Sequence, residues 1–121
     1  MRILDKIVEN KRTEIIKLSS EIPTSLLESK SLFSKESISL KDSILKSHSG
    51  IICEFKRRSP SNNNINYKST ITEVVKGYQE AGAAGLSILT NKIYFDGDIN
   101  DITDIRTVSY THLTLPTILL V

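Results

Sequence analysis

The segment GIICEFKRRSPSNNN, residues 50–64, decides how this chain is organised. A glycine opens it, and the apolar run at residues 51–53 leads directly into Glu54 and Lys56 before the chain breaks at Ser-Pro-Ser. A short apolar run between turn signals predicts a buried β-strand. A carboxylate and an ammonium group at the end of such a strand are unusual, because charged side chains are seldom buried without a partner.

The two faces of this strand are predicted to differ in role, because alternate side chains of a strand share a face. Glu54 and Lys56 share one face at the carboxyl end, where α/β sheets bind their ligands. The sequence therefore favours a ligand site there, and a simple salt bridge at a strand end is the alternative. On one face, helices are expected to cover Ile51, Cys53 and Phe55. The opposite face is expected to point toward the centre of a closed sheet, and it contains Ile52, Glu54 and Lys56.

Periodic patterns on both sides of this segment predict the order of the other elements. Apolar residues at helical spacing predict an amphipathic helix over residues 2–19 and a short helix near residues 39–47. After the strand, a capping box at residues 70–73 opens a helix that Gly82 is placed to end. A second short strand follows at residues 85–89.

The second strand and the helix after it repeat this arrangement. Ser87 and Leu89 are expected to share one face of the strand, and Asp98 is a good cap for a third helix. Alternating strands and helices predict an α/β fold with parallel strands. The apolar stripe of the third helix is expected to contain Ile99, Ile102 and Ile105.

Composition limits the kinds of protein that this chain can be. Its 121 residues, 39% hydrophobic and 25% charged, are typical of one modest globular domain. The net charge of +2 argues against nucleic-acid and membrane partners bound by bulk charge. A single cysteine, Cys53, agrees with a reducing compartment, so we expect a cytoplasmic protein, and we expect no metal site.

Two longer motifs resemble the indole-3-glycerol-phosphate synthase family. The first is IICEFKRRSPS, which contains the pattern Glu-x-Lys-x-x-Ser-Pro-Ser, and the second is YQEAGAAGLSILTNKIYFDGD. The resemblance implies that residues 1–107 are the N-terminal part of a (β/α)8 TIM barrel, with extra N-terminal helices and the first two βα units. It also implies a carboxy-lyase that needs no cofactor and binds an anionic sugar phosphate. The substrate, 1-(2-carboxyphenylamino)-1-deoxyribulose 5-phosphate, would undergo ring closure with loss of carbon dioxide and water.

The resemblance also assigns roles to individual residues. Lys56 would be the catalytic cation that meets the charged groups of the substrate, and Glu54 would hold the active-site lysines in position. The aromatic pair Tyr94 and Phe95 could form a wall of the site or simply pack on the barrel rim. On the resemblance, Ser59 and Ser61 would line the phosphate side, and Leu89 with Phe95 would form part of the wall around the anthranilate ring. The residues assigned to substrate binding are Ser59, Pro60, Ser61, Leu89 and Phe95.

The chain departs from the family pattern near its end. The family's acid, a lysine in a Lys-Asp-Phe block on the third strand, and its base, a glutamate on the fourth, are not found here. Residues 108–121, VSYTHLTLPTILLV, instead resemble the translation of a sequencing adapter, so we expect a non-family tail. A diverged strand over residues 113–121 is the alternative. With only two βα units, the chain alone is predicted to be inactive and poorly folded.

Two other functions remain as alternatives. The first is another phosphate-binding barrel, such as phosphoribosylanthranilate isomerase, although the Glu-x-Lys-x-x-Ser-Pro-Ser block argues against it. The second is a non-catalytic binding module whose KRRSPS loop contacts nucleic acid, although the chain has no basic face with interleaved aromatic residues. The sequence leaves the oligomeric state open.

Overall fold

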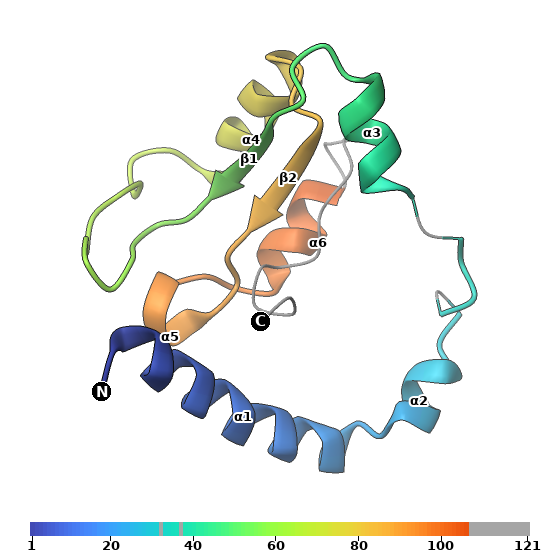
Figure 1. Ribbon diagram of the computed structural model, residues 1–121, viewed down its shortest axis with the longest axis vertical. Helices are drawn as coiled ribbons and strands as arrows, with labels where there is room; N and C mark the ends of the chain where they lie inside the picture. Colours follow the sequence, from blue (N-terminus) through green and yellow to red (C-terminus); the bar gives the residue numbers. More distant parts are fainter. Residues whose placement is uncertain (32, 37, 107–121) are drawn as a thin grey trace. The chain divides into compact units, whose positions relative to one another are not determined.

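The computed structural model describes residues 1–31, 33–36 and 38–106 (Figure 1). The chain divides into two compact units, Met1–Ser37 and Ile38–Val121. The first unit is helical, and both strands belong to the second. The predicted tail, residues 108–121, and the alternative strand within it lie outside the described residues.

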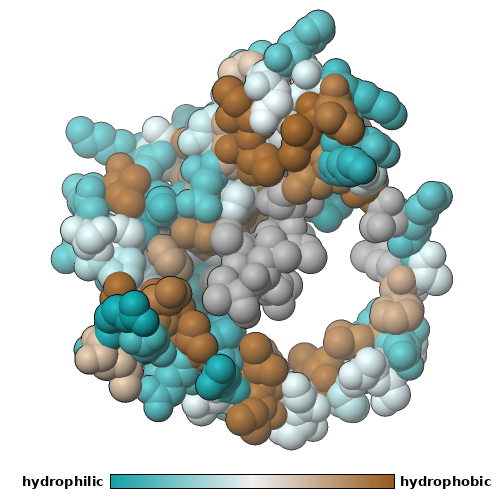
Figure 2. All heavy atoms as spheres, viewed as in Figure 1, coloured by the Kyte–Doolittle hydropathy of each residue, from teal (hydrophilic) through white to brown (hydrophobic). Residues whose placement is uncertain are grey.

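The N-terminal unit contains two helices, α1 (Ile3–Glu21) and α2 (Thr24–Glu28). Helix α1 confirms the helix predicted over residues 2–19, whereas α2 was not predicted. Helix α1 ends because Ile22 precedes Pro23, and a residue before proline is disfavoured in the helical conformation. Apolar side chains of both helices are exposed at the surface (Figure 2), among them Ile15, Ile16, Leu18, Leu26 and Leu27.

The C-terminal unit begins with α3 (Leu40–Lys46), which confirms the helix predicted near residues 39–47. Ser39 caps it by accepting a hydrogen bond from the backbone N–H of Asp42. The Ser43 hydroxyl donates to the carbonyl of Ala84 at 2.5 Å, which joins α3 to the residue just before the second strand. Helix α3 therefore lies at the amino end of the sheet.

The sheet has two parallel strands, β1 (Ile52–Phe55) and β2 (Gly85–Ile88), as the sequence predicted. The helix that connects them, α4 (Ile71–Glu80), begins at the predicted capping box. In that box the Thr70 hydroxyl accepts from the backbone of Glu73, whose carboxylate accepts from the backbone N–H of Thr70. Two residues beyond the end of α4, Gly82 has φ of 85°, which a glycine adopts without strain.

Two short helices follow β2. Helix α5 (Lys92–Phe95), which was not predicted, is capped by Asn91, and α6 (Asn100–Arg106) confirms the predicted third helix. Between them, Gly97 lies so close to the end of β2 that a Cβ atom built on it would be 2.0 Å from the carbonyl oxygen of Leu89. This close approach requires a glycine.

The hydrophobic core lies between the sheet and helices α4 and α6. Cys53 and Phe55 pack on it, as the alternation of β1 predicted. Two expectations were wrong: Ile51 is 56% exposed and Ile99 is 63% exposed. Each lies one residue before its regular element, where the periodicity of that element no longer sets the side-chain direction. The buried core residues are Phe55, Ile71, Val75, Leu86, Ile88 and Ile105.

Candidate functional site

The charged pair predicted at the end of β1 is present. Lys56 Nζ lies 3.0 Å from Glu54 Oε1, and the two side chains are 34% and 36% exposed. Because Phe55 between them points into the core, the alternation of the strand directs both charged groups to the opposite face. Both side chains are partly buried, so solvent screens the attraction between the two charges only in part. Both are also exposed enough for a ligand to reach them.

Ser87 of β2 is a third member of this cluster, and the sequence assigned it no role. The register of the parallel strands places Glu54 beside Ser87. The Ser87 hydroxyl donates to Glu54 Oε2 at 3.2 Å, so the carboxylate uses one oxygen for Lys56 and the other for the serine. The one signal in the sequence was a polar residue within the apolar run of the second strand.

The Ser-Pro-Ser motif forms a tight turn beyond the end of β1. The backbones of Ser59 and Asn62 exchange two hydrogen bonds, at 2.8 and 3.1 Å, and Pro60 lies between them, where its fixed φ favours a turn. The hydroxyls of Ser59 and Ser61 are 3.2 Å apart. Two predicted phosphate-side hydroxyls are thus brought together, and Pro60 and Ser61 are exposed.

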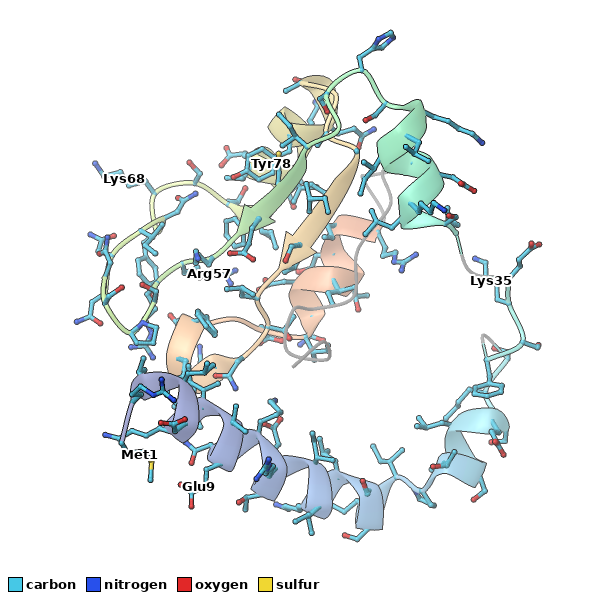
Figure 3. All side chains as sticks on the ribbon, viewed as in Figure 1. Met1, Glu9, Lys35, Arg57, Lys68 and Tyr78 are labelled. Atoms are coloured by element: carbon cyan, nitrogen blue, oxygen red, sulfur yellow. The ribbon has the colours of Figure 1, made fainter. Side chains whose placement is uncertain are left out.

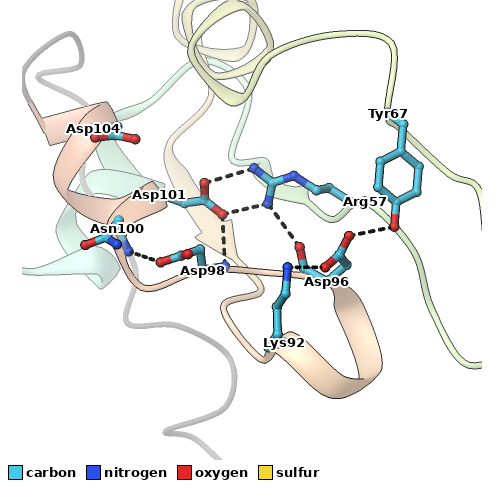
Figure 4. Close-up of a pocket in the computed structure, with 8 residues that line it drawn as sticks. All are labelled: Arg57, Tyr67, Lys92, Asp96, Asp98, Asn100, Asp101 and Asp104. Carbon is cyan, nitrogen blue, oxygen red and sulfur yellow. Dashed lines mark hydrogen bonds and ion pairs between the residues drawn. The ribbon is translucent and has the colours of Figure 1, made fainter.

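Arg57 and Asp101 form a second, tighter pair (Figure 4). The guanidinium group donates to both carboxylate oxygens, at 2.7 and 2.9 Å, and also lies 5.2 Å from the centre of the Phe55 ring. The hydrogen bonds that the guanidinium group donates to Asp101 raise the pKa of Arg57, against the opposing effect of burial. Figure 3 labels Arg57 just beyond the end of β1. Its side chain is 24% exposed.

Asp96 connects the loop after β1 with the segment after β2. Its carboxylate accepts hydrogen bonds from Lys92 Nζ and from the Tyr67 hydroxyl. These two hydrogen bonds lower the pKa of Asp96, and the hydrogen bond between Lys92 and Asp96 raises the pKa of Lys92. An open pocket of about 430 Å³ borders the Arg57–Asp101 and Lys92–Asp96 pairs. The pocket is lined by Arg57, Tyr67, Lys92, Asp96, Asp98, Asn100, Asp101 and Asp104.

The two predicted wall residues follow β2. Leu89 is 6% exposed, and its backbone N–H donates to the carbonyl of Phe55. Phe95 is half-buried at the end of α5, and the close approach of Gly97 to Leu89 holds this helix against the strand end. The structure therefore brings Glu54, Lys56 and Ser87 into contact, and it places the other predicted residues on the loops that follow the same strand ends.

The chain matches the family model described as indole-3-glycerol phosphate synthase over residues 4–115. The chain belongs to this family. Among its relatives, the indole-3-glycerol phosphate synthase of Bacteroides thetaiotaomicron is 40% identical over 104 residues, which cover 86% of this chain and 40% of the relative. The corresponding proteins of Leptospira interrogans and Bacillus cereus are 33% and 38% identical over 104 residues. Each of those two matches covers 86% of this chain and 38% of the relative.

The extent of the match can be compared with the length of the relatives and with the expected boundary of the family region. The chain spans about two fifths of the length of these synthases. The family match continues to residue 115, beyond the boundary that we expected at residue 107, so that boundary stays a prediction.

Two features are absent from the described residues. No helix within them is long and apolar enough to cross a membrane. In the same part of the chain, no group of three or more histidine, cysteine, aspartate and glutamate side chains is arranged to hold a metal ion.

Proposed function

We propose that these residues form the first two βα units of a (β/α)8 barrel, and that the complete protein is an indole-3-glycerol phosphate synthase, a carboxy-lyase. One observation carries the proposal: in a chain of this family, a half-exposed Glu54–Lys56 pair lies at the carboxyl end of a parallel strand. Barrel enzymes build their active sites at that end. The Glu-x-Lys-x-x-Ser-Pro-Ser pattern supports the same conclusion.

The proposed substrate, 1-(2-carboxyphenylamino)-1-deoxyribulose 5-phosphate, carries a carboxylate and a phosphate. Lys56 supplies a cation for these groups, and the contact with Glu54 holds its flexible side chain in place. An ammonium group has three donors, and Glu54 accepts from one of them, so others remain for the substrate. Ring closure places negative charge on the former ketone oxygen, which a positioned cation stabilises.

The neighbouring loops are proposed to bind the rest of the substrate. The tight turn presents the hydroxyls of Ser59 and Ser61 on the phosphate side, with Pro60 fixing the turn. Leu89 and Phe95 would line the wall beside the aromatic ring. The acid and the base of the reaction are expected on later strands, so residues 1–121 alone are proposed to be inactive.

The proposal can be tested in a chimera that completes the barrel. Residues 1–106 of this chain would replace the equivalent residues of the Bacteroides thetaiotaomicron relative, and formation of indole-3-glycerol phosphate would be followed. We expect a cooperatively folded chimera that is active, while residues 1–121 alone are inactive. A chimera that fails to fold, or that folds and forms no product, would overturn the proposal.

A further inference from the structure

The Glu54 carboxylate has two partners on two different strands. Lys56 Nζ lies 3.0 Å from Oε1, and the Ser87 hydroxyl lies 3.2 Å from Oε2. Lys56 is on the same chain segment as Glu54, whereas Ser87 is separated from it by 33 residues. The serine therefore fixes the carboxylate with respect to the sheet, which the lysine cannot do.

The sheet leaves Ser87 little freedom. Its neighbours Leu86 and Ile88 are 0% and 1% exposed in the core, so alternation directs the serine to the opposite face. Ser87 is itself 9% exposed, whereas Glu54 and Lys56 are each about one-third exposed. A short, buried side chain on a strand is a rigid support for a longer, more exposed one.

A lysine held by a glutamate is only as well placed as that glutamate. Glutamate and lysine both have several rotatable bonds, and an ion pair at the surface does not by itself select one geometry. A second hydrogen bond to the other carboxylate oxygen selects one orientation of the carboxylate. The ammonium group of Lys56 is then held along one direction.

We propose that Ser87 is a positioning residue of the synthase, which orients Glu54 so that Glu54 in turn holds Lys56 toward the anionic substrate. This inference rests on the proposed function. Ser87 does not need to touch the substrate for this role, and its effect passes through the carboxylate of Glu54. Loss of the hydroxyl therefore matters only while that carboxylate is present.

A double-mutant cycle in the chimera tests this role. Ser87→Ala is expected to lower kcat/KM about tenfold, because it removes a hydrogen bond to a charged group. Ser87→Thr keeps a hydroxyl and is expected to stay within about threefold of the unsubstituted chimera. In a Glu54→Ala background, Ser87→Ala is expected to cost less than about twofold more, because the carboxylate is already gone.

Ser43→Ala is the matched control. This serine also donates to an acceptor at β2, the carbonyl of Ala84, but at the amino end of the sheet. Its loss is expected to lower stability and to leave kcat/KM within about twofold. Equal effects of Ser87→Ala with and without Glu54, or no rescue by Ser87→Thr, would overturn the positioning role while an active chimera still supports the proposed function. An inactive chimera would overturn both.

Discussion

Two clusters of charge lie within a few residues of each other and are built differently. At the strand ends, Lys56 makes one contact with Glu54, and both side chains are about one-third exposed. In the loops, Arg57 binds Asp101 through two hydrogen bonds, and the aspartate side chain is only 8% exposed. The second cluster uses its hydrogen-bonding groups on itself, so it serves to hold the loops. The first, as proposed above, keeps donors of Lys56 for a ligand.

Lys56→Met should produce the largest effect on activity and almost none on stability. Removing one donor aimed at developing negative charge costs about 100-fold to 1000-fold in rate, and a half-exposed ion pair adds little to folding. Product formation and urea unfolding of the chimera would be measured together. Lys68→Met, which changes an exposed loop lysine, is the control, and a large loss of stability in Lys56→Met would indicate a structural salt bridge.

Gly97→Ala tests the loop side of the comparison. A Cβ atom at this position would lie 2.0 Å from a backbone oxygen at the end of β2, so the segment with Asp96 must move, at a cost of about 3 kcal/mol. The control is Gly77→Ala in α4, where a Cβ meets nothing within 4 Å and alanine should stabilise by about 0.5–1 kcal/mol. Similar unfolding free energies for the two variants would contradict this description of the loop.

Arg57→Met should destabilise the chimera by about 2 kcal/mol, because it leaves the buried Asp101 carboxylate without its partner. Asp101→Asn in the same background should restore part of that loss, since the uncompensated charge is removed. Chemical unfolding of the single and double variants measures both effects. If Arg57→Met lost activity as strongly as Lys56→Met at unchanged stability, the division into a ligand cluster and a loop cluster would be wrong.

The smallest effect is expected from pH. The pKa of Asp96 is lowered by Lys92 and Tyr67, so its contribution is complete above about pH 4, the ordinary aspartate value, and is lost as the pH falls through its lower folded value. Asp96→Asn and Lys92→Met should both make the unfolding free energy depend less on pH below about pH 4. Identical pH profiles for all three proteins would exclude this linkage.

Local patterns predicted the parts of the fold that depend on neighbouring residues. The structure confirms the Thr70–Glu73 capping box, both strands and the packing of Cys53 and Phe55 on the core. Each is set by residues within a few positions of one another. The Glu54–Lys56 contact belongs to the same class, because two residues on one strand face must lie close together. These elements could be read from the sequence for that reason.

Contacts between distant residues could not be predicted in this way. Arg57 and Asp101 are 44 residues apart, and no local pattern in the sequence predicts that they form a pair. Ser87 is 33 residues from Glu54, and its contact with Glu54 depends on the register of two strands, which the pattern of either strand alone does not give. Helix α5 is four residues long, too short for a periodic signal.

Binding of a substrate analogue to the chimera tests most directly whether the strand-end pair is a ligand site. The analogue would carry an alcohol in place of the reacting ketone, and calorimetry would compare the unsubstituted chimera with Lys56→Met. We predict that Lys56→Met weakens binding at least about tenfold at unchanged unfolding free energy, because a cation that meets the substrate is lost. Equal affinities, with a lower stability in Lys56→Met, would show that Glu54 and Lys56 are a structural salt bridge.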